Sequence, residues 1–237
     1  MGLFDFLSKK NAQTPVQRLA IKAADKRGMA PDRWEALQAL SKIDSEEAVE
    51  ALLMRFTFYT DPTITDQEEK DGVFSAIVAK GQLAVAPVKR FFRKAESLSW
   101  PLKILDRVLS PDEVVEILLE QLATMDTEYE RDPQRKLQVL AEFEARRGDK
   151  VAAAVRPFLR DMHEPARFHA VVAVLAQPDP AASRDALAEA LSHEESMRIK
   201  ARILDVFARE SWPLEAGKLG RLPEGYALDA KGVPRKR

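Results

Sequence analysis

Cysteine is absent from this 237-residue sequence, so disulfides, thiolate nucleophiles and cysteine-ligated zinc or iron–sulfur sites are excluded. Neither sign of charge dominates, because 37 basic side chains stand against 38 acidic ones. The chain as a whole therefore carries no electrostatic signal for nucleic acid or for an anionic membrane. We predict no cofactor and no bound metal.

Long apolar runs are also missing, since no stretch approaches the roughly 18 apolar residues of a membrane-spanning helix. In MGLFDFLSKK the lysines follow the short apolar stretch, which reverses the order of a secretory signal. A content of 46% apolar and 32% charged residues is typical of a globular protein with a real core. We expect a soluble, monomeric, cytoplasmic protein.

Motifs of catalysis are missing as well. The sequence has no glycine-rich phosphate loop, no G-x-S-x-G turn and no H-E-x-x-H pair. What it does have is internal repetition. RWEA at 33–36, RFHA at 167–170 and RIKA at 198–201 share the order arginine, large apolar residue, any residue, alanine. Weaker openings complete a series with a period of about 33 residues, and we predict first helices that start near residues 33, 69, 100, 134, 166 and 197.

Each repeat divides into two predicted helices. RWEALQALSKI and EEAVEALLMRF each place apolar residues along one stripe at helical spacing, and the later repeats divide in the same way. We predict that Ser45, Ser110, Asp149 and Asp179 cap second helices. The tetrapeptide SWPL occurs at 99–102 and 211–214. We interpret both copies as helix starts, the second of them opening the last helix of the sixth repeat.

RWEALQALSKIDSEEAVEALL resembles the HEAT-repeat family, in particular the short bacterial HEAT-like repeats, and Pro87 and Pro157 fall where that family often carries a proline. The resemblance covers about residues 31–222. It implies an all-α fold, a right-handed α-solenoid of about six helical hairpins. We therefore predict an amphipathic segment over 1–13, a repeat domain over 14–222 that opens with a capping helix, and a partly ordered tail over 223–237.

In HEAT-like arrays the second helices line the concave face, and here their charges alternate in sign from repeat to repeat. Two interpretations stay open: ion pairs between neighbouring helices, or a striped groove that binds a protein partner of mixed charge. We predict a non-enzymatic interaction scaffold. The candidate partner-binding residues are Lys89, Arg90, Arg93, Arg156, Arg160, Glu50, Glu113, Glu116 and Glu120.

The alternative function is that of a HEAT-like alkylpurine DNA glycosylase or DNA-binding protein, and a second enzyme family with HEAT-like repeats, the deoxyhypusine hydroxylases, provides a further comparison. Alkylpurine DNA glycosylases need a basic concave surface with an acid beside aromatic side chains, whereas Trp34, Trp100 and Trp212 here stand at predicted helix starts, and we expect Trp34 in the core. Deoxyhypusine hydroxylases bind iron through His-Glu dyads inside first helices. The two dyads of this sequence, His163-Glu164 and His193-Glu194, precede those helices, so we interpret them as loop residues that cap carbonyl groups.

Two polar inserts, TDPTITDQEEKDG and TMDTEYERDPQ, are predicted to be exposed acidic loops, which either serve as solvated connectors or extend the edge of a binding surface. At the N-terminus, Leu3, Phe4, Phe6 and Leu7 precede two lysines and would give a helix one apolar side. This segment is predicted to cap the first hairpin. A weak, transient contact of residues 1–12 with a membrane or a partner remains the alternative, and with it a peripheral membrane adaptor as a further function.

Overall fold

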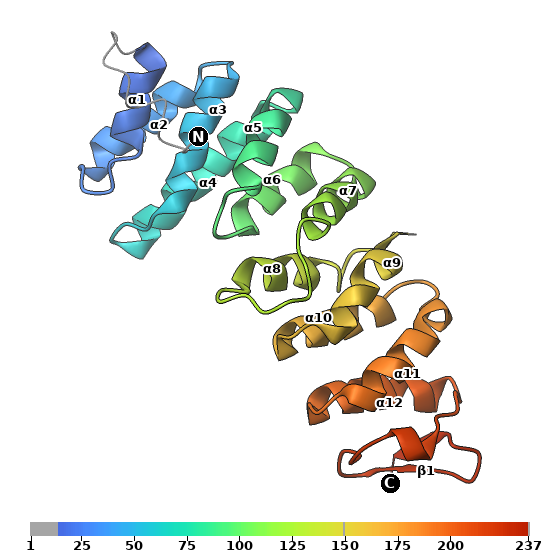
Figure 1. Ribbon diagram of the computed structural model, residues 1–237. Coiled ribbons are helices and arrows are strands. Elements are labelled where there is room, and N and C mark those ends of the chain that lie inside the picture. Colours follow the sequence, from blue (N-terminus) through green and yellow to red (C-terminus); the bar gives the residue numbers. More distant parts are fainter. Residues whose placement is uncertain (1–13, 149, 237) are drawn as a thin grey trace. The chain divides into compact units, whose positions relative to one another are not determined.

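The computed structural model describes residues 14–148 and 150–236, which form twelve α-helices, several short 3-10 turns and one two-stranded hairpin (Figure 1). The all-α prediction is thus confirmed for the part of the chain that is described. Contacts between residues divide the chain into two compact units, one ending at Ser110 and one beginning at Pro111.

The first unit packs its helices in two layers. Its helices are α1 (Pro15–Ala23), α2 (Ala30–Ser41), α3 (Glu46–Leu53), α4 (Thr63–Ala79), α5 (Gln82–Phe92) and α6 (Ser99–Val108). Helices α1, α3 and α5 contact one another in sequence and form one layer, and α2, α4 and α6 form the other. Leu40, Leu52, Ile77 and Val88 lie fully buried between them, so each helix contributes one apolar side to a shared core.

The second unit repeats this arrangement. Its helices are α7 (Pro111–Leu122), α8 (Gln134–Glu142), α9 (Val151–Val155) continued by the 3-10 turn η3 (Arg156–Arg160), α10 (Glu164–Leu175), α11 (Arg184–His193) and α12 (Met197–Arg209). Helices α8, α10 and α12 form one layer, while α7, α9 with η3, and α11 form the second. In both units, therefore, even-numbered helices pack on even ones and odd-numbered helices on odd ones.

The even-numbered helices from α2 to α12 begin at Ala30, Thr63, Ser99, Gln134, Glu164 and Met197. The largest departure from the predicted starts is at α4, which begins at Thr63 instead of near residue 69. The segment predicted to be an exposed acidic loop is thus mostly helical, and Asp66, Glu69 and Lys70 on it are buried. These charged side chains can be buried because they form ion pairs with one another and with arginines of the same unit.

Two of the predicted caps are present. Ser45 accepts a hydrogen bond from the backbone N–H of Ala48 at 3.2 Å, and Asp179 accepts bonds from the backbone N–H groups of Ala181 and Ala182 in the 3-10 turn before α11. Thr14 caps α1 in a reciprocal arrangement with Gln17, which confirms the expected helix ahead of the first repeat. Asp149 lies outside the described residues.

The prediction for the second SWPL was wrong. Ser99 does open α6, although its side chain makes no capping bond. Ser211 instead follows the end of α12 in the left-handed region, with φ of 56°. The segment where the second helix was predicted forms only a short 3-10 turn, Ala216–Lys218, because the N–H of Leu214 donates to the carbonyl of Gly232 in the tail at 2.9 Å. The sixth repeat therefore has no second helix.

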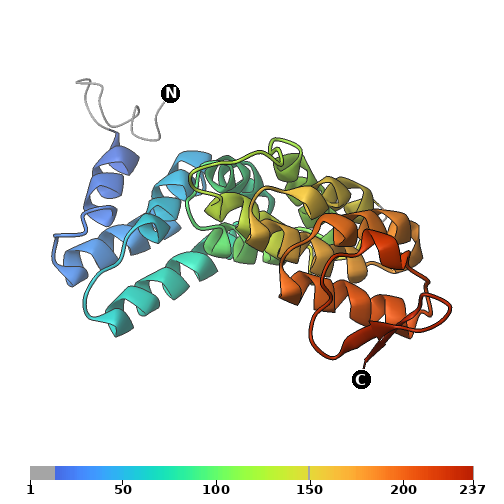
Figure 2. The same cartoon turned by 60° about the horizontal axis from the view of Figure 1, so that its bottom comes forward.

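The tail is more ordered than predicted. Strands β1 (Tyr226–Leu228) and β2 (Pro234–Lys236) pair antiparallel, with Tyr226 opposite Lys236, and β2 packs on α12 (Figure 2). The Tyr226 hydroxyl donates to the Asp205 carboxylate of that helix at 2.5 Å. Burial, together with this bond, raises the pKa of Tyr226 to about 12. The tail is thus tied to the last helix.

Candidate functional site

The candidate surface in the first unit lies on α3 and α5. Arg90 extends from α5 to two carboxylates of α3, at 2.6 Å from Glu46 and 2.8 Å from Glu50. These hydrogen bonds raise the pKa of Arg90 above its ordinary value. The three side chains are each about half exposed, so solvent and a partner can still reach them.

The second unit contains two more pairs of the same kind. Lys150 at the start of α9 lies 2.8 Å from Glu116 of α7, and this hydrogen bond raises the lysine's pKa. Arg160 of η3 lies 2.9 Å from Glu189 of α11. Arg156 instead donates to the carbonyl of Ala152 in the preceding turn, at 3.3 Å.

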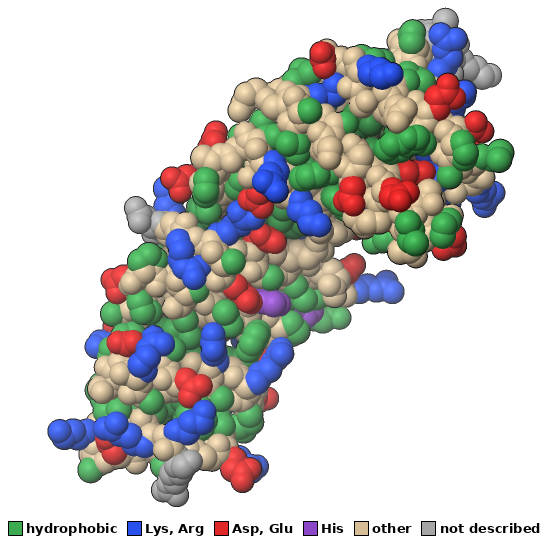
Figure 3. All heavy atoms as spheres, turned by 180° about the vertical axis from the view of Figure 1, so that it is seen from behind, with side chains coloured by type: hydrophobic (Ala, Val, Ile, Leu, Met, Phe, Trp, Pro, Cys, Tyr) green, Lys and Arg blue, Asp and Glu red, His purple; other side chains and the backbone are tan. Residues whose placement is uncertain are grey.

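Of the remaining predicted residues, Lys89 is half-buried, and Arg93, Glu113 and Glu120 are exposed. The structure thus unites Arg90 with Glu50, whereas Glu113, Glu116 and Glu120 belong to the other unit. On the face shown in Figure 3, blue basic and red acidic side chains are interspersed over both units. Neighbouring odd-numbered helices are joined by half-exposed ion pairs, which contribute little to stability.

A second set of charges, missed at the sequence level, is buried in the first unit. Both oxygens of Glu69 are engaged by Arg33, at 2.8 and 2.9 Å, and Arg55 donates to the same carboxylate at 2.6 Å. Arg55 also reaches Asp66 at 2.7 Å, as does Lys70. Burial alone would raise the pKa of Asp66, but hydrogen bonds from Lys70, Arg55 and the Thr60 backbone outweigh it and hold the pKa below its usual value.

The arginine of the repeat motif has the same role in the second unit. Arg167 donates to Glu194, in the loop between α11 and α12, at 2.8 and 2.9 Å, and it also donates to the carbonyl of Asp161 in the loop before its own helix. Arg33 makes the equivalent bonds to the carbonyls of Asp25 and Gly28. Arg33 and Arg167 therefore link a helix start to a later segment, whereas the third motif arginine, Arg198, pairs with Glu164 at the start of the preceding even-numbered helix. We assign the motif arginines a structural role.

The two His-Glu dyads were predicted to be loop residues, but they lie at helix ends: Glu164 opens α10 and His193 closes α11. The ring of His163 accepts the backbone N–H of Glu130 at 3.2 Å, Glu164 pairs with Arg198 at 2.6 Å, and Glu194 is held by Arg167. No group of three or more potential metal ligands gathers within 14–148 and 150–236.

The tryptophan rings pack within their own units. Trp100 stacks on Phe56, with ring centroids 4.7 Å apart, and Trp212 meets the edge of Phe207 at 5.2 Å. Trp34 was predicted to lie in the core, yet 37% of it is exposed, because its ring lies over the helix surface at Gly72. An added Cβ on that glycine would come within 2.6 Å of the ring.

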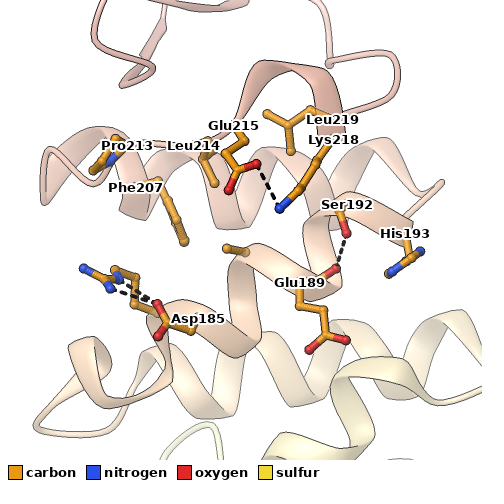
Figure 4. Close-up of a pocket in the computed structure, with 12 residues that line it drawn as sticks. Asp185, Glu189, Ser192, His193, Phe207, Pro213, Leu214, Glu215, Lys218 and Leu219 are labelled. Atoms are coloured by element: carbon orange, nitrogen blue, oxygen red, sulfur yellow. Dashed lines mark hydrogen bonds and ion pairs between the residues drawn. The ribbon is translucent and has the colours of Figure 1, made fainter.

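A cleft of about 540 Å³ lies between α11, α12 and residues 213–219 (Figure 4). Its charged side chains are paired locally, Arg184 with Asp185 and Glu215 with Lys218, each at 2.9 Å. The Ser192 hydroxyl donates to the carbonyl of Glu189 at 2.7 Å. This arrangement places no serine against a general base, so we assign the cleft no reaction.

Leu3, Phe4, Phe6 and Leu7 lie outside the described residues. Among the helices of the described part, none combines the length and the apolar character that crossing a bilayer requires. No family model matches this chain, and neither a curated protein nor a solved structure does.

Proposed function

We propose that this protein is a non-enzymatic scaffold of the HEAT-like α-solenoid type, which binds a protein partner in the cytoplasm through its odd-numbered helices. The observation that carries the proposal is the series of half-exposed ion pairs between successive odd helices, of which Arg90 with Glu50 is the clearest. Such pairs add little to stability, but they fix charges of both signs at defined positions. Fixed, alternating charge is suited to selecting a complementary protein surface.

The experiment separates recognition from structure by exchanging charges within a pair. Arg90→Glu combined with Glu46→Arg and Glu50→Arg keeps opposite charges in contact but inverts the sign presented to a partner. The same exchange at Arg160 and Glu189 provides an equivalent in the second unit. Tagged wild-type and exchanged proteins are expressed in the native cells, and the co-purifying proteins are compared by mass spectrometry.

We expect at least one protein to be enriched by the wild type and lost from an exchanged variant whose unfolding midpoint is unchanged. If the exchanged variants retain the same partners as wild type, the ion pairs only join helices and the proposed surface is wrong. The single change Arg90→Glu serves as the internal comparison, because it both breaks the pair and alters the surface.

A further inference from the structure

Large apolar side chains are left exposed on the second unit where its even-numbered helices begin. Tyr129 precedes α8, Met162 precedes α10 and Met197 opens α12, with exposed fractions of 69%, 60% and 41%. The Tyr129 ring stacks on His163, next to Met162, with ring centroids 5.2 Å apart. Tyrosine is enriched among the residues that dominate binding energy, and methionine adapts to varied partners.

Exposed acidic side chains lie in the same loops as these apolar residues. Asp126, Glu128 and Asp132 in the loop before α8 are exposed, as is Glu195 before α12, and Arg131 is the exposed basic residue in the same loop. Asp126 and Asp132 each use one carboxylate oxygen to accept a nearby backbone N–H, at 3.0 and 3.2 Å. We define the acidic edge as these four acids together with Tyr129 and Met162.

The acidic edge differs from the odd-helix surface in its charge balance. On the odd helices, Glu46, Glu50, Glu116 and Glu189 each face a cation of the same unit at 2.6–2.9 Å. At the acidic edge, the exposed arginines Arg160 and Arg198 are already paired with Glu189 and Glu164. Among the described residues, Arg131 is then the exposed cation left to face the four acids. The complement of this surface is therefore a cationic group supplied from outside.

The loop that carries the acidic edge is fixed before any partner arrives. Buried Lys136 pairs with Asp161 at 2.8 Å and with Glu130 of the loop at 2.9 Å. The N–H of Met162 donates to the carbonyl of Thr127 at 3.0 Å. A surface held in this way loses little conformational entropy on binding.

We propose that the acidic edge binds a segment of another protein in which lysines or arginines flank a large apolar side chain. The apolar side chain packs on Tyr129 and Met162, and the flanking cations face Glu128 and the neighbouring acids. An anionic lipid surface or a nucleic acid would be repelled by the same acids. Arg160, which belongs to the ion pairs of the odd-numbered helices, and Glu195 of the acidic edge line one cavity. The proposal nevertheless rests on other residues than the function proposed for those ion pairs and does not depend on it.

The test uses a fluorescein-labelled peptide in which pairs of lysines flank a leucine and a phenylalanine, and a second peptide with glutamates in place of the lysines. Binding to the full-length protein is followed by fluorescence anisotropy at low and at high salt. We expect the lysine peptide to bind, more weakly at high salt, and the glutamate peptide not to bind. Tyr129→Ser with Met162→Ser should weaken binding by about tenfold or more. Glu128→Lys with Glu195→Lys should weaken it and reduce its dependence on salt.

Matched controls come from the first unit. Met29 and Ile64 are 70% and 73% exposed and also lie where even-numbered helices begin, so Met29→Ser with Ile64→Ser removes equivalent apolar surface elsewhere. Absence of binding by the lysine peptide would overturn the proposal, as would an equal loss in this control variant. Binding of the wild type to phosphatidylserine vesicles, lost on changing Tyr129 and Met162, would also overturn it in favour of a membrane contact. The charge exchange at Arg90, Glu46 and Glu50 in the first unit should leave peptide binding unchanged.

Discussion

Replacing Glu69 with alanine tests whether the buried charges of the first unit act as one network. The Glu69 carboxylate lies between two buried guanidinium groups, and the side chain of Arg55 is fully buried. Removing one partner of a buried ion pair costs roughly 3 to 5 kcal/mol, because the remaining charge stays desolvated. Arg33 retains two carbonyl acceptors and Arg55 retains Asp66, so we expect the lower end, about 3 kcal/mol.

The matched control is Glu68→Ala, which makes the same change at an exposed position of the same helix. Urea unfolding should show the midpoint of Glu69→Ala lowered by about 1 M or more, and Glu68→Ala within about 0.5 kcal/mol of wild type. Hydrogen exchange over residues 63–79 should increase in the first variant only. Glu69→Gln should retain most of the loss, since it keeps the volume and removes the charge. Equal stability of the Glu68 and Glu69 variants would refute the reasoning.

Three further predictions follow from single contacts. Ser45→Ala should lower the free energy of unfolding by about 1 kcal/mol, and Ser99→Ala should be close to neutral, because only the first hydroxyl caps a helix; paired urea curves check this. The folded-state pKa of Asp66 is lowered, so its stabilisation is present above the unfolded pKa near 3.9 and is lost as the pH falls through the folded value. The stability gap between wild type and Asp66→Asn should therefore shrink below about pH 4 in acid titrations of unfolding. Ultraviolet difference spectra of wild type against Tyr226→Phe should show Tyr226 ionising near pH 12, and Asp205→Asn should lower that value. The stabilisation from this raised pKa is present below about pH 10 and is lost as the pH rises through 12.

Helical periodicity alone located most of the helices, because the apolar stripes of the repeats are strong and their spacing is regular. It did not find the buried charges, although a signal was present. Asp66, Glu69 and Lys70 continue the stripe of Val73 and Ile77 at helical spacing, so a charged turn of α4 faces the interior. A sequence analysis that assigns charged residues to the surface does not recognise such a turn as buried. The arginines that neutralise Glu69 come from other elements of the unit.

The failure at the second SWPL has a different cause. The same four residues open α6 at Ser99 but follow α12 at Ser211. At the second copy the backbone N–H of Leu214 donates a hydrogen bond to Gly232 of the tail and does not form part of a helix. That hydrogen bond depends on a hairpin that begins at Tyr226, so a sequence pattern within residues 211–214 cannot predict it. Local sequence was therefore sufficient where apolar stripes dominate, and insufficient where a distant segment supplies the hydrogen bonds.

Buried and exposed charged residues of this protein can be separated in mutational tests of its function. The motif arginines Arg33 and Arg167 pair with buried carboxylates of α4 and of the loop before α12, so mutating them would alter the fold together with any surface. Half-exposed pairs such as Arg90 with Glu50 can be exchanged in sign while the contact is kept. Exposed acids such as Glu128 can be reversed without breaking a described ion pair. Loss of a partner on changing these last two kinds of residue, with stability unchanged, can therefore be assigned to recognition.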